Sequence, residues 1–358
     1  MDASGLRAEF PVLASRAYLN AGTDGPLPAV AVRAVVAEME GELNEGRAGA
    51  HFKRRGELAS ELRRAYARAL SCETHDVALT SSTTEGIGQV VAGLELGRGD
   101  EIVTSDEEHP GLLGALGAAR ELRGVSVRAV PFAEVANAVG SNTRLVACSH
   151  VGWMSGSYAP TELAGLDVPV LLDGAQGVGA VPVDVAELGC DAYAGAGQKW
   201  LCGPDGTGML FVSPELRERL SVSRRGYSNL ATPDAGLDAE LHGDARCFDA
   251  ASLSAEAMAC ALAAVSLLED VGWAAVHGRA RALAGTFSAA LAEHGREPAP
   301  RGETTLVSFA SGDPEGERER LLGEGIVLRN IPGRPWLRAS VGAWNDESDL
   351  ERLLDALA

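Results

Sequence analysis

Short apolar runs alternate with helical patterns in the first part of this 358-residue chain, and this alternation limits the fold more than any other feature. We expect helices at residues 85–94 and 110–122, between runs that are typical of buried strands. Alternating strands and helices predict an α/β fold, with a large, doubly wound and mainly parallel sheet. The expected strands are 77–80, 101–104, 125–130, 145–149 and 170–173.

The pattern changes after about residue 235, where longer amphipathic helices come first and strands follow. We therefore predict a small α+β domain at 236–358, a large domain at 21–235, and an N-terminal segment at 1–20 that packs near the site and the small domain. The boundary lies at 231–238, which contains Pro233 and Gly236. The expected elements of the small domain are helices at 255–270, 279–294 and 346–358, the last capped by Asn345, and strands at 305–310, 326–329 and 336–341.

Charge and composition exclude several classes of protein. The net charge of −19 disfavours nucleic acid and anionic membranes as partners, because both need a basic surface. We see no signal peptide and no apolar run long enough to span a bilayer, so we expect a cytoplasmic protein. Six cysteines without CxxC spacing indicate reduced thiols and no metal site.

Lysine is rare in this chain. Only Lys53 and Lys199 are lysines among 31 basic residues, and the others are arginines. Lysine can lose its proton and attack a carbonyl group, whereas arginine stays protonated. Lys53 lies in a basic run typical of a solvated face, while Lys199 lies among small and apolar residues. We interpret Lys199 as an imine-forming lysine rather than a snorkelling one.

Other candidate residues follow the predicted strands, where chemistry collects in open α/β sheets. Asp173 ends an apolar strand and precedes a glycine-rich turn, although a helix cap is the common role for such an aspartate. His109 and His150 follow two other strands, and a lone histidine is more often structural. The Ser-Ser-Thr-Thr run at 81–84 precedes a helix and suits either a phosphate or a simple cap.

Taken together, these residues match the requirements of pyridoxal phosphate (PLP). Lys199 supplies an amine for an imine with the cofactor aldehyde, and Asp173 supplies a carboxylate for the ring nitrogen. His109 can stack on the ring, and the run at 81–84 can hold the phosphate.

Several motifs closely resemble the class V aminotransferase family of fold-type I PLP enzymes. The family includes cysteine desulfurases, selenocysteine lyases, cyst(e)ine C–S lyases and isopenicillin N epimerase. The resemblance covers nearly the whole chain, and the spacing from Asp173 to Lys199 also matches. It rests on YLNAG at 18–22, LTSSTTEG at 79–86, EH at 108–109, LLDGAQGVG at 171–179, GQK at 197–199, GPDGTG at 203–208 and LRAS at 337–340.

The resemblance implies a role for each matching residue. Lys199 would hold PLP and act as the base at Cα, Asp173 would stabilise the pyridinium, and His109 would stack on the ring. Arg338 would bind the substrate carboxylate as a bidentate fork. Gln176 would bond the phenolate oxygen of the cofactor, and Trp153 would lie beside the cofactor. The phosphate would be held by Thr83, Thr84 and Gln198 of the same subunit and by Ser252 of a neighbouring subunit. Asn20 and Ala21 would contact the substrate. The contact from Ser252 implies a homodimer with shared active sites.

The chain departs from cysteine desulfurases in an informative way. Desulfurases carry a nucleophilic cysteine in the loop before the Arg-Ala-Ser motif, and here residues 330–337 contain none. Gln198 replaces a histidine, Ala196 replaces a serine, and Trp153 replaces an asparagine. These differences favour the branch of the C–S lyases and the epimerase.

We therefore expect a PLP-dependent lyase that eliminates a group from Cβ of an amino acid without a catalytic cysteine. The expected products are a thiol or persulfide, pyruvate and ammonia. The alternatives are racemisation, epimerisation or transamination on the same fold, and a non-catalytic scaffold. Racemisation needs a second proton carrier, which the sequence does not identify.

Overall fold

A seven-stranded sheet forms the centre of the molecule in the computed structural model, which describes residues 2–358. The strand order is β2-β8-β7-β6-β5-β3-β4, and only β8 runs antiparallel to its two neighbours. The predicted doubly wound, mainly parallel sheet is confirmed. Its strands are β2 (Val77–Thr80), β3 (Glu101–Ser105), β4 (Ser126–Val130), β5 (Thr143–Ser149), β6 (Val170–Asp173), β7 (Ala192–Ala196) and β8 (Gly208–Val212).

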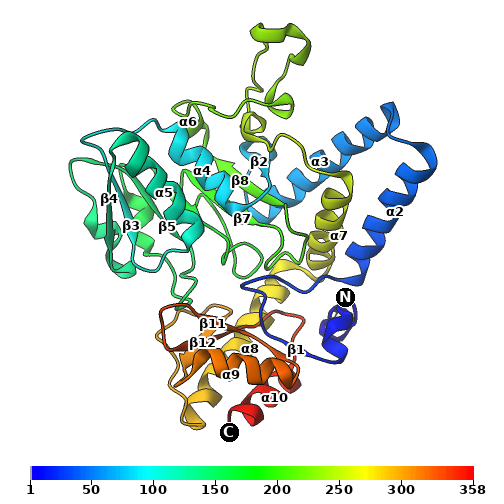
Figure 1. The fold of residues 1–358 in the computed structure, drawn as a ribbon, viewed down its shortest axis with the longest axis vertical. Helices are drawn as coiled ribbons and strands as arrows, with labels where there is room; N and C mark the ends of the chain where they lie inside the picture. The colour runs from blue at the N-terminus through cyan, green and yellow to red at the C-terminus, as the bar shows by residue number, and fades with distance from the viewer. Residues whose placement is uncertain (1) are drawn as a thin grey trace.

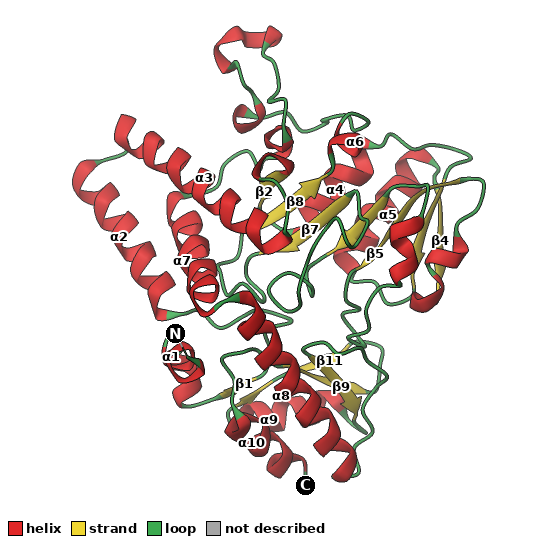
Figure 2. Ribbon diagram, turned by 180° about the vertical axis from the view of Figure 1, so that it is seen from behind, coloured by secondary structure: helices red, strands yellow, loops and turns green. Residues whose placement is uncertain are grey.

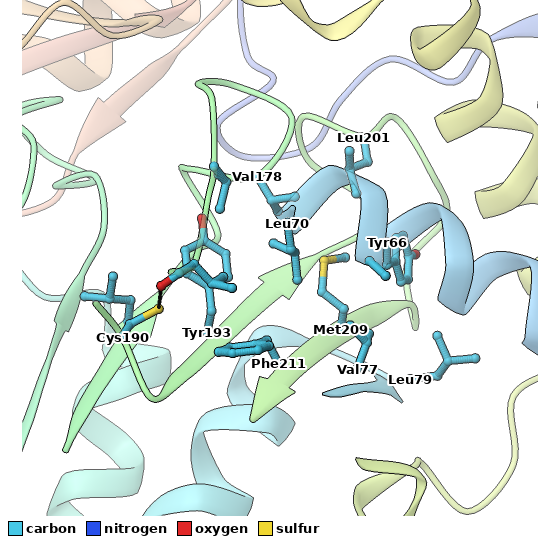
Figure 3. Packing of buried hydrophobic residues seen from close by; sticks show 14 of the residues in the cluster. Tyr66, Leu70, Val77, Leu79, Val178, Cys190, Tyr193, Leu201, Met209 and Phe211 are labelled. Carbon is cyan, nitrogen blue, oxygen red and sulfur yellow. Dashed lines mark hydrogen bonds between the residues drawn. The ribbon is translucent and has the colours of Figure 1, made fainter. Parts of the chain in front are cut away.

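Helices cover both faces of this sheet, so the strands are apolar on both sides. Helices α3 (Gly49–Leu70) and α7 (Ala255–Val271) contribute to the core on one face, where Figure 3 shows Tyr66 and Leu70 beside Met209 and Phe211. Helices α4 (Thr83–Gly93), α5 (Pro110–Arg123) and α6 (Pro214–Arg217) contribute to the core on the other face. Alternate residues of each strand point to these two cores, which fixes the register of the sheet.

A smaller unit lies at the other end of the molecule, and both chain termini lie near it (Figure 1). It contains an antiparallel sheet in the order β11-β12-β9 and a parallel pair of β1 and β10. The strands are β1 (Ala17–Tyr18), β9 (Leu306–Ala310), β10 (Ile326–Val327), β11 (Arg329–Ile331) and β12 (Trp336–Ser340). The helices are α1 (Ala3–Ala8), α8 (Trp273–Glu293), α9 (Pro314–Gly323) and α10 (Glu347–Leu357).

Helix α7 packs against α3 and against α2 (Ala29–Glu45), which project together from one side of the large sheet (Figure 2). The chain then bends by 83° at Gly272, whose φ of +94° suits glycine, and continues as α8. The domain boundary predicted after residue 235 stays a prediction. Helix α7 lies after that residue, but it packs against α2 and α3 of the large unit. Within residues 2–358, no single helix is long and apolar enough to cross a membrane, and α7 and α8 pass that test only as a bent pair.

Some local predictions are wrong at their ends. Helix α4 starts two residues earlier than expected, because the side chain of Ser82 accepts a hydrogen bond from the N–H of Glu85 and caps the helix. Asp346, and not Asn345, caps α10, because Asn345 accepts instead from the N–H of Gly342. The strand expected at 326–329 is split between β10 and β11, which pair with different partners.

Candidate active site

A cavity of about 260 Å³ lies at the edge of the large sheet where β2, β3, β5, β6 and β7 have their carboxyl ends. This edge is where an open α/β sheet places its ligands. The lining includes eight of the predicted site residues, namely Thr83, Thr84, His109, Trp153, Asp173, Gln176, Gln198 and Lys199. Residues separated by more than a hundred positions in the sequence thus meet in one hollow.

Lys199 lies in the turn that follows β7, and its side chain is half-buried. Burial lowers the pKa of its amine to about 8, because the charged form loses hydration. The negative charge of Asp173 opposes this change, and the positive charges of Arg338 and Arg329 add to it. Roughly a tenth of the amine is therefore neutral at pH 7, and this form is able to act as a nucleophile or base.

Asp173 is the last residue of β6 and is buried at the base of the cavity. One carboxylate oxygen accepts a hydrogen bond from the N–H of Ala175 at 2.9 Å. Burial raises the pKa of Asp173, while the charge of Lys199 opposes that change. No ion pair within 4.0 Å is formed by Asp173 in residues 2–358, so its carboxylate is available to a cationic ligand.

His109 and Trp153 form an aromatic wall of the cavity. Their rings meet edge to face, with centroids 5.3 Å apart. His109 accepts a hydrogen bond from the N–H of Gly111 on Nδ1 at 3.0 Å, so a neutral ring carries its proton on Nε2. Burial, together with the charges of Lys199, Arg329 and Arg338, lowers the pKa of His109 to about 4. A neutral, flat ring of this kind can stack on a planar ligand.

The amino end of α4 supplies an anion-binding wall. Thr83 and Thr84 lie in its first turn, where backbone N–H groups lack partners within the helix. The hydroxyl of Thr83 and the side-chain oxygen of Gln198 are buried without a hydrogen-bond partner among the described residues. The Thr83 hydroxyl can donate a hydrogen bond to the phosphate of a bound ligand. The Gln198 oxygen is an acceptor, so Gln198 can bind a phosphate only through its amide nitrogen.

Gln176 uses both ends of its amide to hold the site together. Its Nε2 donates to the backbone oxygen of Gly22 at 2.7 Å, and its Oε1 accepts from the indole of Trp200 at 3.0 Å. The second hydrogen of Nε2 stays available to a ligand. Gln176 thus ties the N-terminal loop to the turn that carries Lys199.

Arg338 on β12 is completely buried and does not line the cavity directly. Its Nη1 donates to the backbone oxygen of Trp153, while Nε and Nη2 have no partner in the described part of the chain. Burial and the charge of Arg329 lower the pKa of Arg338 to about 9. Gly22 lies against it, since a Cβ there would come within 2.8 Å of Nη2.

The sequence did not identify Arg329 as a site residue, although it lines the cavity. It stands opposite Arg338 in the β11–β12 ladder, and its guanidinium lies 5.4 Å above the ring of Trp153. Like charges on paired residues are unfavourable unless an anion lies between them. A hairpin signal, Pro332-Gly333 between two arginines, could have revealed this pairing.

The N-terminal loop reaches the cavity with different residues from those expected. Gly22, Thr23 and Asp24 line it. Asn20 instead forms a bridge to Ser340, and Ala21 is fully buried in a hydrophobic core. The predicted substrate contacts of Asn20 and Ala21 are therefore not supported by their positions.

Three other candidates lie outside the cavity. Ser252 is exposed in a separate surface hollow and accepts a hydrogen bond from Arg55 at 3.1 Å. His150 is buried, and its Nδ1 lies 3.1 Å from the hydroxyl of Tyr193, which is a structural role. Lys53 is exposed and pairs with Glu57, as expected for a solvated face.

All six cysteines are free, and none lines the cavity in residues 2–358. Cys202 follows the Lys199 turn but is buried, with its pKa raised well above the ordinary value by burial. Cys148 on β5 is also buried, and burial raises its pKa well above the ordinary value. Such protonated thiols are poor nucleophiles.

Comparisons with known proteins agree with this geometry. The Aminotransferase class-V family model matches residues 18–353. A probable cysteine desulfurase of Pseudomonas aeruginosa is 31% identical, with 98% of this chain and 96% of the relative covered. An isopenicillin N epimerase of Streptomyces clavuligerus is 25% identical, with coverages of 95% and 93%.

The solved structures include the cystine C–S lyase C-DES in complex with its reaction product, cysteine persulfide. It has a TM-score of 0.92 and 27% identity, with 97% of this chain and 98% of that chain covered. A C-DES variant with glycine covalently linked to the PLP cofactor has a TM-score of 0.91 and 28% identity, with 98% of both chains covered.

Proposed function

Since the chain belongs to the Aminotransferase class-V family, we propose that it is a PLP-dependent enzyme that eliminates a group from Cβ of an amino acid. The similarity to C-DES, a cystine C–S lyase that was also solved with PLP, supports this proposal. The product would be a free thiol or persulfide, released together with pyruvate and ammonia.

The residues around the cavity fit PLP. Lys199 would hold its aldehyde carbon covalently, Asp173 would face its ring nitrogen, and His109 would cover one face of its ring. The hydroxyl of Thr83, buried without a partner, would donate to the phosphate, and Gln198 would donate through its amide nitrogen. When bound, PLP supplies an electron sink for a carbanion at Cα of the substrate.

The chain's own groups would carry the remaining steps. The arginines would bind the substrate carboxylate, and this grip would decide which bond of Cα is broken. The amine of Lys199, with its pKa lowered to about 8, would take the proton from Cα. The buried negative charge of Asp173 would keep the cofactor ring protonated.

The observation that carries the elimination is the hairpin of β11 and β12. Only residues 332–335 join Arg329–Ile331 to Trp336–Ser340, and Gly333 has a φ of +74° in this turn. This tight turn carries no thiol toward the substrate sulfur. Sulfur would therefore leave with its electron pair from Cβ without passing to a protein cysteine.

The test is a screen of the PLP-loaded enzyme with amino acids that carry a leaving group on Cβ, including L-cystine, S-alkyl cysteines and β-chloroalanine. We expect pyruvate and ammonia in equal amounts, with one thiol or persulfide for each sulfur substrate. Deuterium incorporation at Cα without pyruvate would support an epimerase or racemase instead. Conversion of a keto acid to an amino acid would support an aminotransferase. A purified protein that binds no PLP would support a non-catalytic scaffold.

We also propose a homodimer with shared active sites. Ser252 lies outside the cavity of its own chain, next to exposed Tyr227 and Phe52. A second copy could therefore bring its Ser252 to the phosphate side. We propose the cytoplasm as the location, because the six free cysteines fit a reducing compartment.

A further inference from the structure

Positive charge dominates the inner part of the cavity. Lys199 and Arg329 line it, and Arg338 is buried directly behind Gly22. If the proposed function holds, the arginines take the α-carboxylate of the substrate, and the α-amino group reacts at the cofactor. The side chain of the substrate is then the part that reaches the mouth.

Negative charge lies at that mouth. Asp24 lines the cavity but is exposed, and its backbone is fixed by two contacts of its loop. The N–H of Gly25 donates to the backbone oxygen of Gln198 at 2.7 Å, and the hydroxyl of Tyr18 donates to the backbone oxygen of Asp24 at 2.9 Å. A Cβ at Gly25 would collide with the backbone oxygen of Lys199, so the loop sits directly on the turn that carries Lys199.

Asp205 adds a second carboxylate on the loop between β7 and β8, against which Gly25, the residue after Asp24, packs. It is exposed in the turn between β7 and β8, which the hydroxyl of Thr207 stabilises by donating to the backbone oxygen of Pro204 at 2.8 Å. Burial raises the pKa of Asp24 and the charge of Asp205 raises it further, while Lys199 and Arg329 oppose the change. Neither carboxylate forms an ion pair within residues 2–358. The two like charges repel each other, and a cation near them would lower that repulsion.

We propose that Asp24, which lines the cavity, selects substrates whose side chain ends in a positively charged group, with the charge of Asp205 adding to the effect. An ammonium group at the far end of the side chain would be attracted to the carboxylate of Asp24. A substrate with an anionic side chain would be repelled by the same pair. This inference rests on the proposed function and names the class of substrate that the site prefers.

The test compares two amino acids of nearly equal shape, S-(2-aminoethyl)-L-cysteine, which is cationic, and S-propyl-L-cysteine, which is neutral. The ratio of their kcat/KM values for pyruvate release measures the preference. We expect the wild-type enzyme to prefer the cationic substrate, and Asp24→Asn to lower the ratio by roughly fivefold. Asp24→Asn combined with Asp205→Asn should remove the preference.

Asp167→Asn is the matched control. Asp167 is exposed and precedes β6, at the opposite edge of the sheet from the cavity. Its replacement by asparagine removes one negative charge, as Asp24→Asn does. The ratio of kcat/KM for the cationic over the neutral substrate should be the same in Asp167→Asn as in the wild type. High salt should reduce the wild-type preference and leave that of the double variant unchanged, because exposed charges are screened.

A binding measurement separates this inference from the proposed function. L-Lysine and L-norleucine carry no leaving group on Cβ, and their binding to the PLP-loaded enzyme can be followed by the absorption of the cofactor. A preference for L-lysine that Asp24→Asn reduces would support the charge selection even if no substrate yields pyruvate. Equal binding of the two by the wild type, or a preference that Asp24→Asn leaves unchanged, would overturn it.

Discussion

At the residue scale, two groups of opposite sign, the half-buried Lys199 and the buried Asp173, lie together in the cavity. Lys199 and Asp173 come from neighbouring strands, and each changes the pKa of the other in the direction that favours its charge. Burial acts against both charges. The balance leaves Lys199 with a pKa of about 8, which suits an amine that alternates between its charged and neutral forms.

Lys199→Arg should abolish covalent attachment of the cofactor although the positive charge is kept, because arginine does not lose its proton. Borohydride treatment followed by peptide mass spectrometry should locate the reduced cofactor on Lys199 in the wild type and nowhere in the variant. Lys53 is exposed and serves as the internal control. A cofactor adduct on Lys53 in the wild type would contradict the assignment.

The rate of cofactor attachment should depend on pH in a defined direction. Only the neutral amine reacts, so the rate at which the apoenzyme takes up PLP should rise with pH and level off above about 8. In Asp173→Asn the midpoint should move to lower pH, because the charge of Asp173 raises the pKa of Lys199. Stopped-flow absorption over a pH series measures both curves. A midpoint that stays fixed or rises in the variant would contradict this coupling.

Asp173→Asn should also keep the cofactor bound but lower turnover. The variant loses the negative charge that keeps the ring nitrogen protonated, and the loss of such an electrostatic partner costs on the order of a hundredfold in kcat. Steady-state kinetics, with cofactor content measured in parallel, separates lost turnover from lost cofactor. Near-normal turnover in the variant would show that protonation of the ring nitrogen is not needed.

At the scale of elements, the proposed elimination rests on the β11–β12 hairpin. Its antiparallel register sets Arg329 opposite Arg338, and its tight turn leaves no room for a long loop with a nucleophile. The same hairpin thus provides the two guanidinium groups and excludes the thiol that a desulfurase carries there.

Replacing each of the six cysteines in turn by alanine or serine should therefore keep turnover within about tenfold of the wild type. Each thiol can contribute to packing, and none lines the cavity in residues 2–358. Cys202 is the most sensitive position, because it is buried with a φ of +55° next to the Lys199 turn. Complete loss of turnover in one variant, together with a persulfide trapped on that cysteine in the wild type, would restore the desulfurase mechanism.

At the scale of the whole molecule, one chain encloses most of the site but leaves Ser252 outside its own cavity. Helices α2 and α3 project from the same body and carry exposed apolar residues, namely Val32, Val36, Met39, Leu43 and Phe52. An exposed apolar surface of this kind is typical of a protein–protein interface. Both features are consistent with the proposed homodimer.

A hybrid dimer of Lys199→Ala and Ser252→Ala subunits tests the shared site. If Ser252 acts across the interface, one of its two sites contains wild-type Lys199 and wild-type Ser252, and the other contains both changes. The hybrid should then bind PLP at one site with wild-type affinity, while the Ser252→Ala homodimer binds it more weakly at both. The hybrid dimer can be isolated through a different affinity tag on each subunit, and a PLP titration then measures its binding stoichiometry and affinity. Weak binding in the hybrid, or a monomer in light scattering, would contradict the shared site.

The sequence by itself determined the features that depend on local spacing. Period-two and apolar runs revealed five strands of the large sheet, and the setting of Lys199, Asp173 and the run at 81–84 revealed the chemistry of the site. Strand β7 was missed because its small residues and glycine carry a weak strand signal. Strand β8 has an apolar run at 209–212 that is typical of a buried strand and could have been predicted.

Only the tertiary structure decided which neighbours of those motifs face the cavity. Ala21 is buried in a core while Asp24, three residues later, reaches the mouth, because packing against the Lys199 turn sets the path of the loop. Arg329 enters the site through its pairing with Arg338. Such placements depend on contacts between segments that are distant in sequence, and local propensity carries no information about them.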